Sequence, residues 1–225
     1  MKQNLTHITF IIDKSGSMES RRQQIVGGFN EFVDAQRKED GEATVSIIQF
    51  SSLGWFGSDE GYVETVLNKD IKNIKPMTLE DYVPSGGTAL FDAIGKTISN
   101  LGRDLAGLNE SLRPSKVMIV IMTDGEENSS REYDSKSVGG MITRQKNEYS
   151  WEFMFVGSDQ NSVLMAKNLL NIDGGLAVAV DNNWKKNMEG ITRSVSSYRC
   201  GEERSVYSQV LNESVSSIGH EGELP

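Results

Sequence analysis

ITFIIDKSGSM, residues 8–18, is an apolar run that ends in an acid, with two hydroxyl side chains close behind. An uninterrupted apolar run predicts a strand that is buried on both faces of a parallel sheet. Ligands of open α/β sheets bind beyond the carboxyl ends of such strands. Asp13, Ser15 and Ser17 are therefore expected on a loop at that edge. Carboxylate and hydroxyl oxygens suit Mg²⁺, Mn²⁺ or Ca²⁺ rather than zinc, so the stretch indicates a divalent-cation site.

The composition is that of a folded protein with an acidic surface. The chain has 225 residues, of which 37% are hydrophobic and 24% charged, and its formal net charge is −9. This charge argues against a nucleic-acid backbone or an anionic membrane as the main partner. The apolar runs are too short to cross a bilayer. A single cysteine, Cys200, excludes an internal disulfide, and a cytoplasmic location is the default expectation.

Apolar segments alternate between strand-like and helix-like patterns along the chain. Besides the opening strand, strands are expected at 43–50, 62–67, 116–122, 151–156 and 176–180, and helices at 18–38, 89–105, 135–149, 162–170 and 184–198. This alternation predicts a doubly wound, mostly parallel sheet, Rossmann-like, with helices on both faces. Residues 62–67 are expected to form one antiparallel edge strand.

A change of composition near Cys200 suggests where the domain ends. Residues 1–200 are expected to form one α/β domain, and residues 201–225 a C-terminal tail rich in Gly, Glu and Ser. Apolar residues between Val206 and Ile218 indicate a short docking helix in this tail, and residues 219–225 have the composition of a disordered end.

Two later segments add oxygen ligands. PSGGT, residues 84–88, precedes the helix expected at 89–105, so the Thr88 hydroxyl is either a helix N-cap or a metal ligand. TDG, residues 123–125, follows the apolar strand 116–122 and places Asp124 at its end. Because parallel strands end at the same edge of a sheet, Asp13 and Asp124 are expected to meet.

Together, these three segments resemble the von Willebrand factor type A (vWA) domain and its metal-ion-dependent adhesion site (MIDAS). The family pattern is D-x-S-x-S, then a Thr in a Gly-rich loop, then an Asp in a T-D-G turn. This chain fills it in order with Asp13, Ser15, Ser17, Thr88 and Asp124. The motifs are closest to stand-alone bacterial or phage members, and they extend over roughly the first 200 residues.

The resemblance implies how these residues share an ion. Ser15, Ser17 and Thr88 would touch Mg²⁺ directly, with Mn²⁺ or Ca²⁺ as alternatives, and Asp13 and Asp124 would bind it at least through water. Three neutral hydroxyls leave the ion most of its charge. In the family, an Asp or Glu carboxylate of a protein partner completes the shell. The implied function is an intracellular protein-interaction module and not an enzyme.

Two other functions remain open from the sequence. A metal-assisted hydrolase acting on phosphoesters would use the same acids and cation. Against it, the only histidines are His7 and His220, and no phosphate-binding P-loop or dinucleotide fingerprint is present. A virion or surface structural component is the third possibility. The partner and the oligomeric state are not specified by the sequence.

Several charged residues flank the predicted site. Lys14 would place a positive charge at its rim. Glu126 and Glu127 are expected to be solvated loop acids, with extra metal ligands or residues that disfavour an acidic partner as the alternatives. Asp92, four residues after Thr88, is expected to hydrogen-bond the loop from its helix. Arg21 is expected on the outward, solvated face of the helix 18–38, as are Arg22, Arg37 and Lys38. Trp55 and Phe56 lie in a polar loop, where they either pack on the domain or bind a partner.

Overall fold

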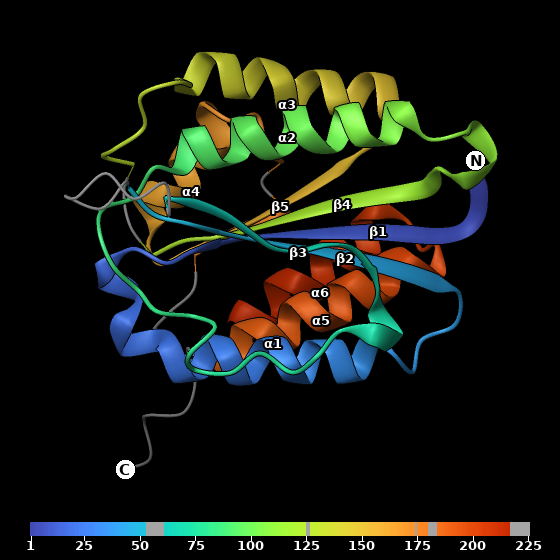
Figure 1. Ribbon diagram of the computed structural model, residues 1–225, viewed down its shortest axis with the longest axis horizontal. Coiled ribbons are helices and arrows are strands. Elements are labelled where there is room, and N and C mark those ends of the chain that lie inside the picture. Colours follow the sequence, from blue (N-terminus) through green and yellow to red (C-terminus); the bar gives the residue numbers. More distant parts are fainter. Residues whose placement is uncertain (53–60, 125–126, 174, 180–183, 217–225) are drawn as a thin grey trace, which may run out of the picture.

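The computed structural model describes residues 1–52, 61–124, 127–173, 175–179 and 184–216. A sheet with strand order β3-β2-β1-β4-β5-β6 lies between two layers of helices (Figure 1). The strands are β1 (Lys2–Asp13), β2 (Glu42–Phe50), β3 (Tyr62–Asp70), β4 (Pro114–Met122), β5 (Glu152–Gly157) and β6 (Ala177–Ala179). The α-helices are α1 (Arg22–Gln36), α2 (Leu90–Gly107), α3 (Ser135–Tyr149), α4 (Gln160–Asn168), α5 (Trp184–Cys200) and α6 (Arg204–Ser216). Three short 3-10 helices join them: η1 (Gly16–Arg21), η2 (Ile71–Asn73) and η3 (Glu110–Leu112).

The central strand β1 determines where the polar loops meet. It pairs in parallel with β2 on one side and β4 on the other, so Ile8 lies opposite Val45 and Met118. β5 and β6 continue the parallel arrangement, and β3 alone runs antiparallel, at the edge beside β2. The predicted fold, a mostly parallel doubly wound sheet with one antiparallel edge strand, is therefore confirmed. It brings the carboxyl ends of β1, β4 and β5 to one edge.

Helices cover both faces of the sheet. α2, α3 and α4 lie on one face, and α1, α5 and α6 lie on the other (Figure 1). The second layer is anchored by aromatic packing: the ring of Phe10 in β1 lies 4.8 Å from Phe32 and 5.5 Å from Phe29, both in α1. Burial of such rings and of the aliphatic strand residues supplies the main force that holds the layers together.

Three elements differ from the sequence-based expectation. β1 begins at Lys2, because the polar residues before Ile8 still pair with the neighbouring strand, a backbone interaction that leaves no apolar signature. The helix expected at 18–38 is divided into η1 and α1, which meet at Arg21 and Arg22. β3, expected at 62–67, continues to Asp70 and is followed directly by η2.

The C-terminal segment includes a helix. α6 packs against α5 and β6, and its Tyr207 and Leu211 are buried in the common core. The division at residue 200 stays a prediction, and residues 217–225 lie outside the described part of the chain, as do Trp55 and Phe56. Among the described helices, none combines the length and the apolar character that crossing a membrane requires.

Candidate metal centre

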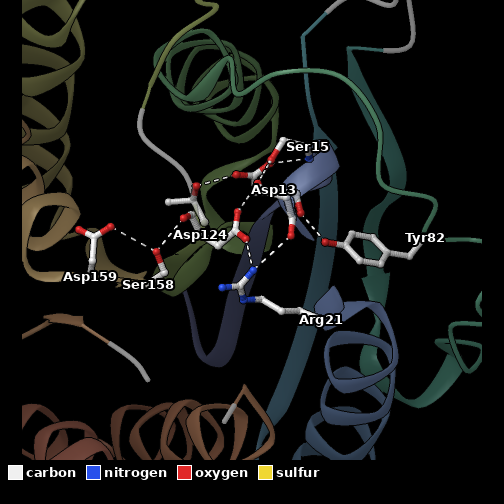
Figure 2. A network of polar contacts seen from close by, with 9 residues as sticks. Asp13, Ser15, Arg21, Tyr82, Asp124, Ser158 and Asp159 are labelled. Carbon is white, nitrogen blue, oxygen red and sulfur yellow. Dashed lines mark hydrogen bonds and ion pairs between the residues drawn. The ribbon is translucent and has the colours of Figure 1, made fainter. Parts of the chain in front are cut away.

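Asp13 ends β1 and is held in place by neighbouring polar groups. Its carboxylate is fully buried. Oδ1 accepts a 2.7 Å hydrogen bond from the backbone N–H of Ser15, and Oδ2 accepts a 2.6 Å hydrogen bond from the hydroxyl of Thr123 (Figure 2). The hydroxyl of Tyr82 donates to the Asp13 carbonyl oxygen. These contacts fix the acid between the ends of β1 and β4.

The surroundings of Asp13 favour a cation. Burial raises the pKa of its carboxyl to about 6, although hydrogen bonds from Thr123 and Ser15 act in the opposite direction. The negative charge of nearby Asp124 raises that pKa further. Two carboxylates that are close together and shielded from water repel each other, and a cation between them relieves both the repulsion and the loss of hydration.

A chain of short oxygen–oxygen contacts links the other ligand candidates. The hydroxyl oxygens of Ser15 and Ser17 lie 3.0 Å apart, and the Ser17 hydroxyl donates a 2.7 Å hydrogen bond to Oδ1 of Asp124. The Asp124 side chain is only 1% exposed, whereas Ser17 is exposed to solvent. The hydroxyl of Ser158, which follows β5, donates to the Asp124 carbonyl oxygen at 2.7 Å. The cluster is therefore accessible to solvent at Ser17.

Thr88 lies on a loop that is joined to the Asp13–Ser17 loop through the backbone. Gly16 N–H donates to the carbonyl of Gly86 at 2.9 Å, and Ser85 N–H donates to the carbonyl of Lys14 at 2.7 Å. Thr88 itself is buried. The N-cap position of α2 is Ala89, so the alternative role of Thr88 as that cap is wrong. The loop contacts bring Thr88 to the same sheet edge as the other four candidates.

Arg21 belongs to the site, contrary to the expected solvated position. Its guanidinium Nη1 forms an ion pair with Oδ2 of Asp124 and donates to the Ser17 carbonyl at 3.2 Å (Figure 2). The reason is the 3-10 turn η1, which replaces the continuous helix assumed from the sequence and changes the direction of its last side chain. No feature of the sequence separates Arg21 from the neighbouring Arg22.

Two further acids organise the loop that follows the site. Glu127 accepts hydrogen bonds from the backbone N–H groups of Ser129, Ser130 and Phe91 at 2.7–2.9 Å, so its expected role as a solvated acid is wrong. Asp92 does hydrogen-bond a loop from its helix, but not the loop that carries Thr88: its carboxylate accepts from the backbone N–H groups of residues 131–133. Both acids tie this loop to the N-terminus of α2. Gly125 and Glu126 lie outside the described residues.

The donor set fits a hard divalent cation. Within the part of the chain that the structure describes, no three His, Cys, Asp or Glu side chains form a metal-binding group. An ion at this edge would therefore be held by hydroxyls and water together with Asp13 and Asp124. Adjacent ligands of an octahedral ion with bonds of about 2.1 Å lie about 3 Å apart. The Ser15–Ser17 separation of 3.0 Å matches that spacing.

Several solved structures share this fold. The pilus adhesin SpaC from Lactobacillus rhamnosus GG superimposes with a TM-score of 0.66 and 17% identity, over 88% of this chain and 30% of SpaC. Proximal thread matrix protein 1 from the mussel byssus superimposes with a TM-score of 0.55 and 15% identity, over 86% of this chain and 46% of that protein. The chain thus spans about a third to a half of these proteins.

One of these structures bears on the metal. In that structure of the mussel protein, the MIDAS motif is occupied by zinc. The identities are too low to transfer more than the fold. No curated protein sequence matches the chain. A family model does match: the model of the von Willebrand factor type A domain covers residues 7–172, from within β1 to just beyond α4. The chain therefore belongs to the von Willebrand factor type A domain family.

Proposed function

We propose that this chain is a protein-interaction module that binds Mg²⁺ at Asp13, Ser15, Ser17, Thr88 and Asp124 and captures a carboxylate of a partner protein. The observation that carries the proposal is the contact chain from Ser15 through Ser17 to Asp124, beside a buried Asp13. When bound, the ion would supply a positive centre to which a partner carboxylate can bind. Mn²⁺ and Ca²⁺ would serve the same donors.

The division of labour among the residues follows from their surroundings. Ser17 lies on the solvent side and would present the ion to the partner. The carboxylates of Asp13 and Asp124 are buried and would balance the charge of the ion from the side that faces the protein interior. Thr123 and Ser158 hold these two acids in position through hydrogen bonds. Lys14, next to the buried Asp13, would add positive charge at the rim and favour an acidic partner surface.

We propose binding rather than catalysis. A hydrolase would need a group that accepts a proton from water near the cation. His7 is buried in β1 with hydrogen bonds to Thr44 and Thr9, and it lies six residues before Asp13. At about 3.3 Å per strand residue this places it roughly 20 Å from the site. We further propose that the protein is cytoplasmic, on the basis of its single cysteine. We also propose that it is of bacterial or phage type, on the basis of the residues that make up its three motifs.

Affinity capture tests the function. The immobilised protein is incubated with a lysate of its own source organism in Mg²⁺ or in EDTA, and the retained proteins are identified by mass spectrometry. We expect a reproducible set that is kept in Mg²⁺ and lost both in EDTA and with the Asp124→Asn variant. Asp104→Asn is the matched control, because Asp104 is an exposed acid on α2.

Two results would contradict the proposal. A set of retained proteins that is the same in EDTA and with Asp124→Asn would show that capture does not use the metal site. Hydrolysis of generic phosphoesters that requires Mg²⁺ and is abolished by Asp13→Ala would show that the site performs chemistry.

A further inference from the structure

Asp124 already has a cationic partner within the protein. The guanidinium of Arg21 pairs with its Oδ2, while Oδ1 accepts from Ser17 (Figure 2). Both oxygens of this carboxylate are therefore engaged. The Asp124 side chain is 1% exposed and the Arg21 side chain 20%, so water screens this ion pair less than it would a pair on an open surface.

Arg21 also bridges two segments of the site. The same Nη1 group that contacts Asp124 donates to the backbone carbonyl of Ser17. The guanidinium thus draws the Ser17 turn and the end of β4 together, which is the task expected of a metal ion bound between them. Arg21 is the last residue of η1, so it is attached to the same turn that carries the ligand hydroxyls.

The charge balance of the cluster changes when an ion enters. Asp13 and Asp124 carry two negative charges when ionised, and Arg21 compensates one of them. A divalent cation compensates both. With the ion and the guanidinium at Asp124 together, the cluster would hold three positive charges against two negative ones, at short range and with little water. Like charges in such a site repel strongly.

We infer that Arg21 is an internal cation that competes with the divalent ion for Asp124 and thereby weakens metal binding by this site. The inference rests on the proposed function, because it assumes that Asp124 serves the ion. Arg21 is accordingly not a metal ligand but a residue that sets the metal concentration at which the site fills.

Isothermal titration calorimetry with MgCl₂ and with MnCl₂ tests this role in Arg21→Gln. Glutamine keeps a long polar side chain and removes the charge. We expect at least tenfold tighter binding than in the wild type, which corresponds to about 1.4 kcal/mol. Arg22→Gln is the matched control. It removes the same charge from the next residue, whose contacts are Glu19 and the Leu79 carbonyl, and its affinity should stay within twofold of the wild type.

The outcomes separate this inference from the proposed function. Equal or weaker binding by Arg21→Gln, or an equal gain in Arg22→Gln, would overturn the competition, while the metal site itself would stand. If neither the wild type nor Arg21→Gln bound a divalent ion, the proposed function would fail together with the inference.

A measurement on the wild type covers the case in which Arg21→Gln does not fold. Hydrogen exchange of the Arg21 guanidinium, followed by NMR, should accelerate at least tenfold when saturating Mg²⁺ is added, because the ion pair with Asp124 is released. The Arg22 guanidinium serves as the internal reference. An exchange rate of Arg21 that Mg²⁺ leaves unchanged would overturn the inference.

Discussion

The hydroxyl of Thr123 donates a 2.6 Å hydrogen bond to Oδ2 of Asp13, and this contact joins the ends of two neighbouring strands, β4 and β1. Both residues are fully buried. A neutral donor orients the carboxylate without cancelling its charge, so the acid remains available to a cation. The contact also fixes the distance between the two strand ends from which the proposed ligands project.

Replacing Thr123 by valine is expected to destabilise the protein. The change keeps the shape of the side chain and removes a hydrogen bond to a buried carboxylate, a loss of about 1–3 kcal/mol in the free energy of unfolding. Urea denaturation measures this value. The control is Thr192→Val. The hydroxyl of Thr192 donates to the Met188 carbonyl of its own helix, and its removal should lower the free energy of unfolding by less than about 0.5 kcal/mol. Equal losses in the two variants would show that the Thr123 contact has no special value.

Removing both serine hydroxyls is expected to abolish Mg²⁺ binding and preserve the fold. The double variant Ser15→Ala, Ser17→Ala deletes two of the proposed ligands, whereas the backbone N–H of residue 15 still binds Asp13. Calorimetry with MgCl₂ should show no binding, and the circular dichroism spectrum should match that of the wild type. Ser205→Ala, Ser208→Ala on α6 controls for the loss of two hydroxyls. Unchanged Mg²⁺ affinity would mean that the site has been assigned wrongly.

The sequence predicts both the central strands of the sheet and the position of the acids Asp13 and Asp124, because the apolar runs show where these strands lie and where they end. An uninterrupted apolar run can be satisfied only by burial on two faces, and it therefore marks a central parallel strand. The runs that become β1 and β4 each end directly at an acid or shortly before one. Since parallel strands share their direction, the meeting of Asp13 and Asp124 can be expected without any knowledge of side-chain contacts.

The supporting residues are not predictable in this way. Tyr82, Ser158 and Arg21 reach the site from three different segments, through contacts that span 34 to 103 residues of sequence. No local pattern distinguishes Arg21 from other helix-surface arginines. Its position depends on the 3-10 geometry of η1, which differs from an α-helix by a small change in hydrogen bonding. These contacts join residues that are far apart in the sequence, so they can be identified only from the three-dimensional structure.

Gly86→Ala is expected to disturb the loop that carries Thr88. Gly86 has φ +77°, a backbone conformation that costs other residues about 1–2 kcal/mol. An added Cβ would also lie 3.0 Å from the Ser52 hydroxyl and 3.1 Å from its carbonyl. We expect the free energy of unfolding, measured by urea denaturation, to fall by at least about 1–2 kcal/mol. We also expect weaker Mg²⁺ binding in calorimetry.

Gly102→Ala provides the opposite control for Gly86. Gly102 lies within α2, and an added Cβ would meet no atom within 4 Å. Alanine there should raise the unfolding free energy by up to about 1 kcal/mol through its higher helix propensity, without affecting Mg²⁺ binding. If Gly86→Ala were as stable as the wild type and bound Mg²⁺ equally well, the conformation of this loop would not determine the site.

Acid is expected to destabilise the protein through His7. Burial lowers the pKa of this side chain to about 4, whereas the unfolded chain titrates near 6.5. His7 is thus neutral in the folded state, and the unfolded state binds the extra proton. The stabilising contribution of neutral His7 to the free energy of unfolding is fully retained above about pH 6.5 and is lost as the pH falls toward 4. Between pH 7 and pH 5 the loss amounts to about 2 kcal/mol.

Comparison with His7→Asn isolates this contribution from the titration of the carboxylates. Asparagine does not titrate, yet it retains polar atoms toward Thr44 and Thr9, which hydrogen-bond the imidazole in the wild type. The variant is expected to be less stable at pH 7, because the smaller side chain packs less well. Its unfolding free energy, measured by urea denaturation, should fall about 2 kcal/mol less than that of the wild type between pH 7 and pH 5. Parallel pH profiles for the two proteins would show that His7 is protonated equally in the folded and unfolded states, which its complete burial in the central strand β1 argues against.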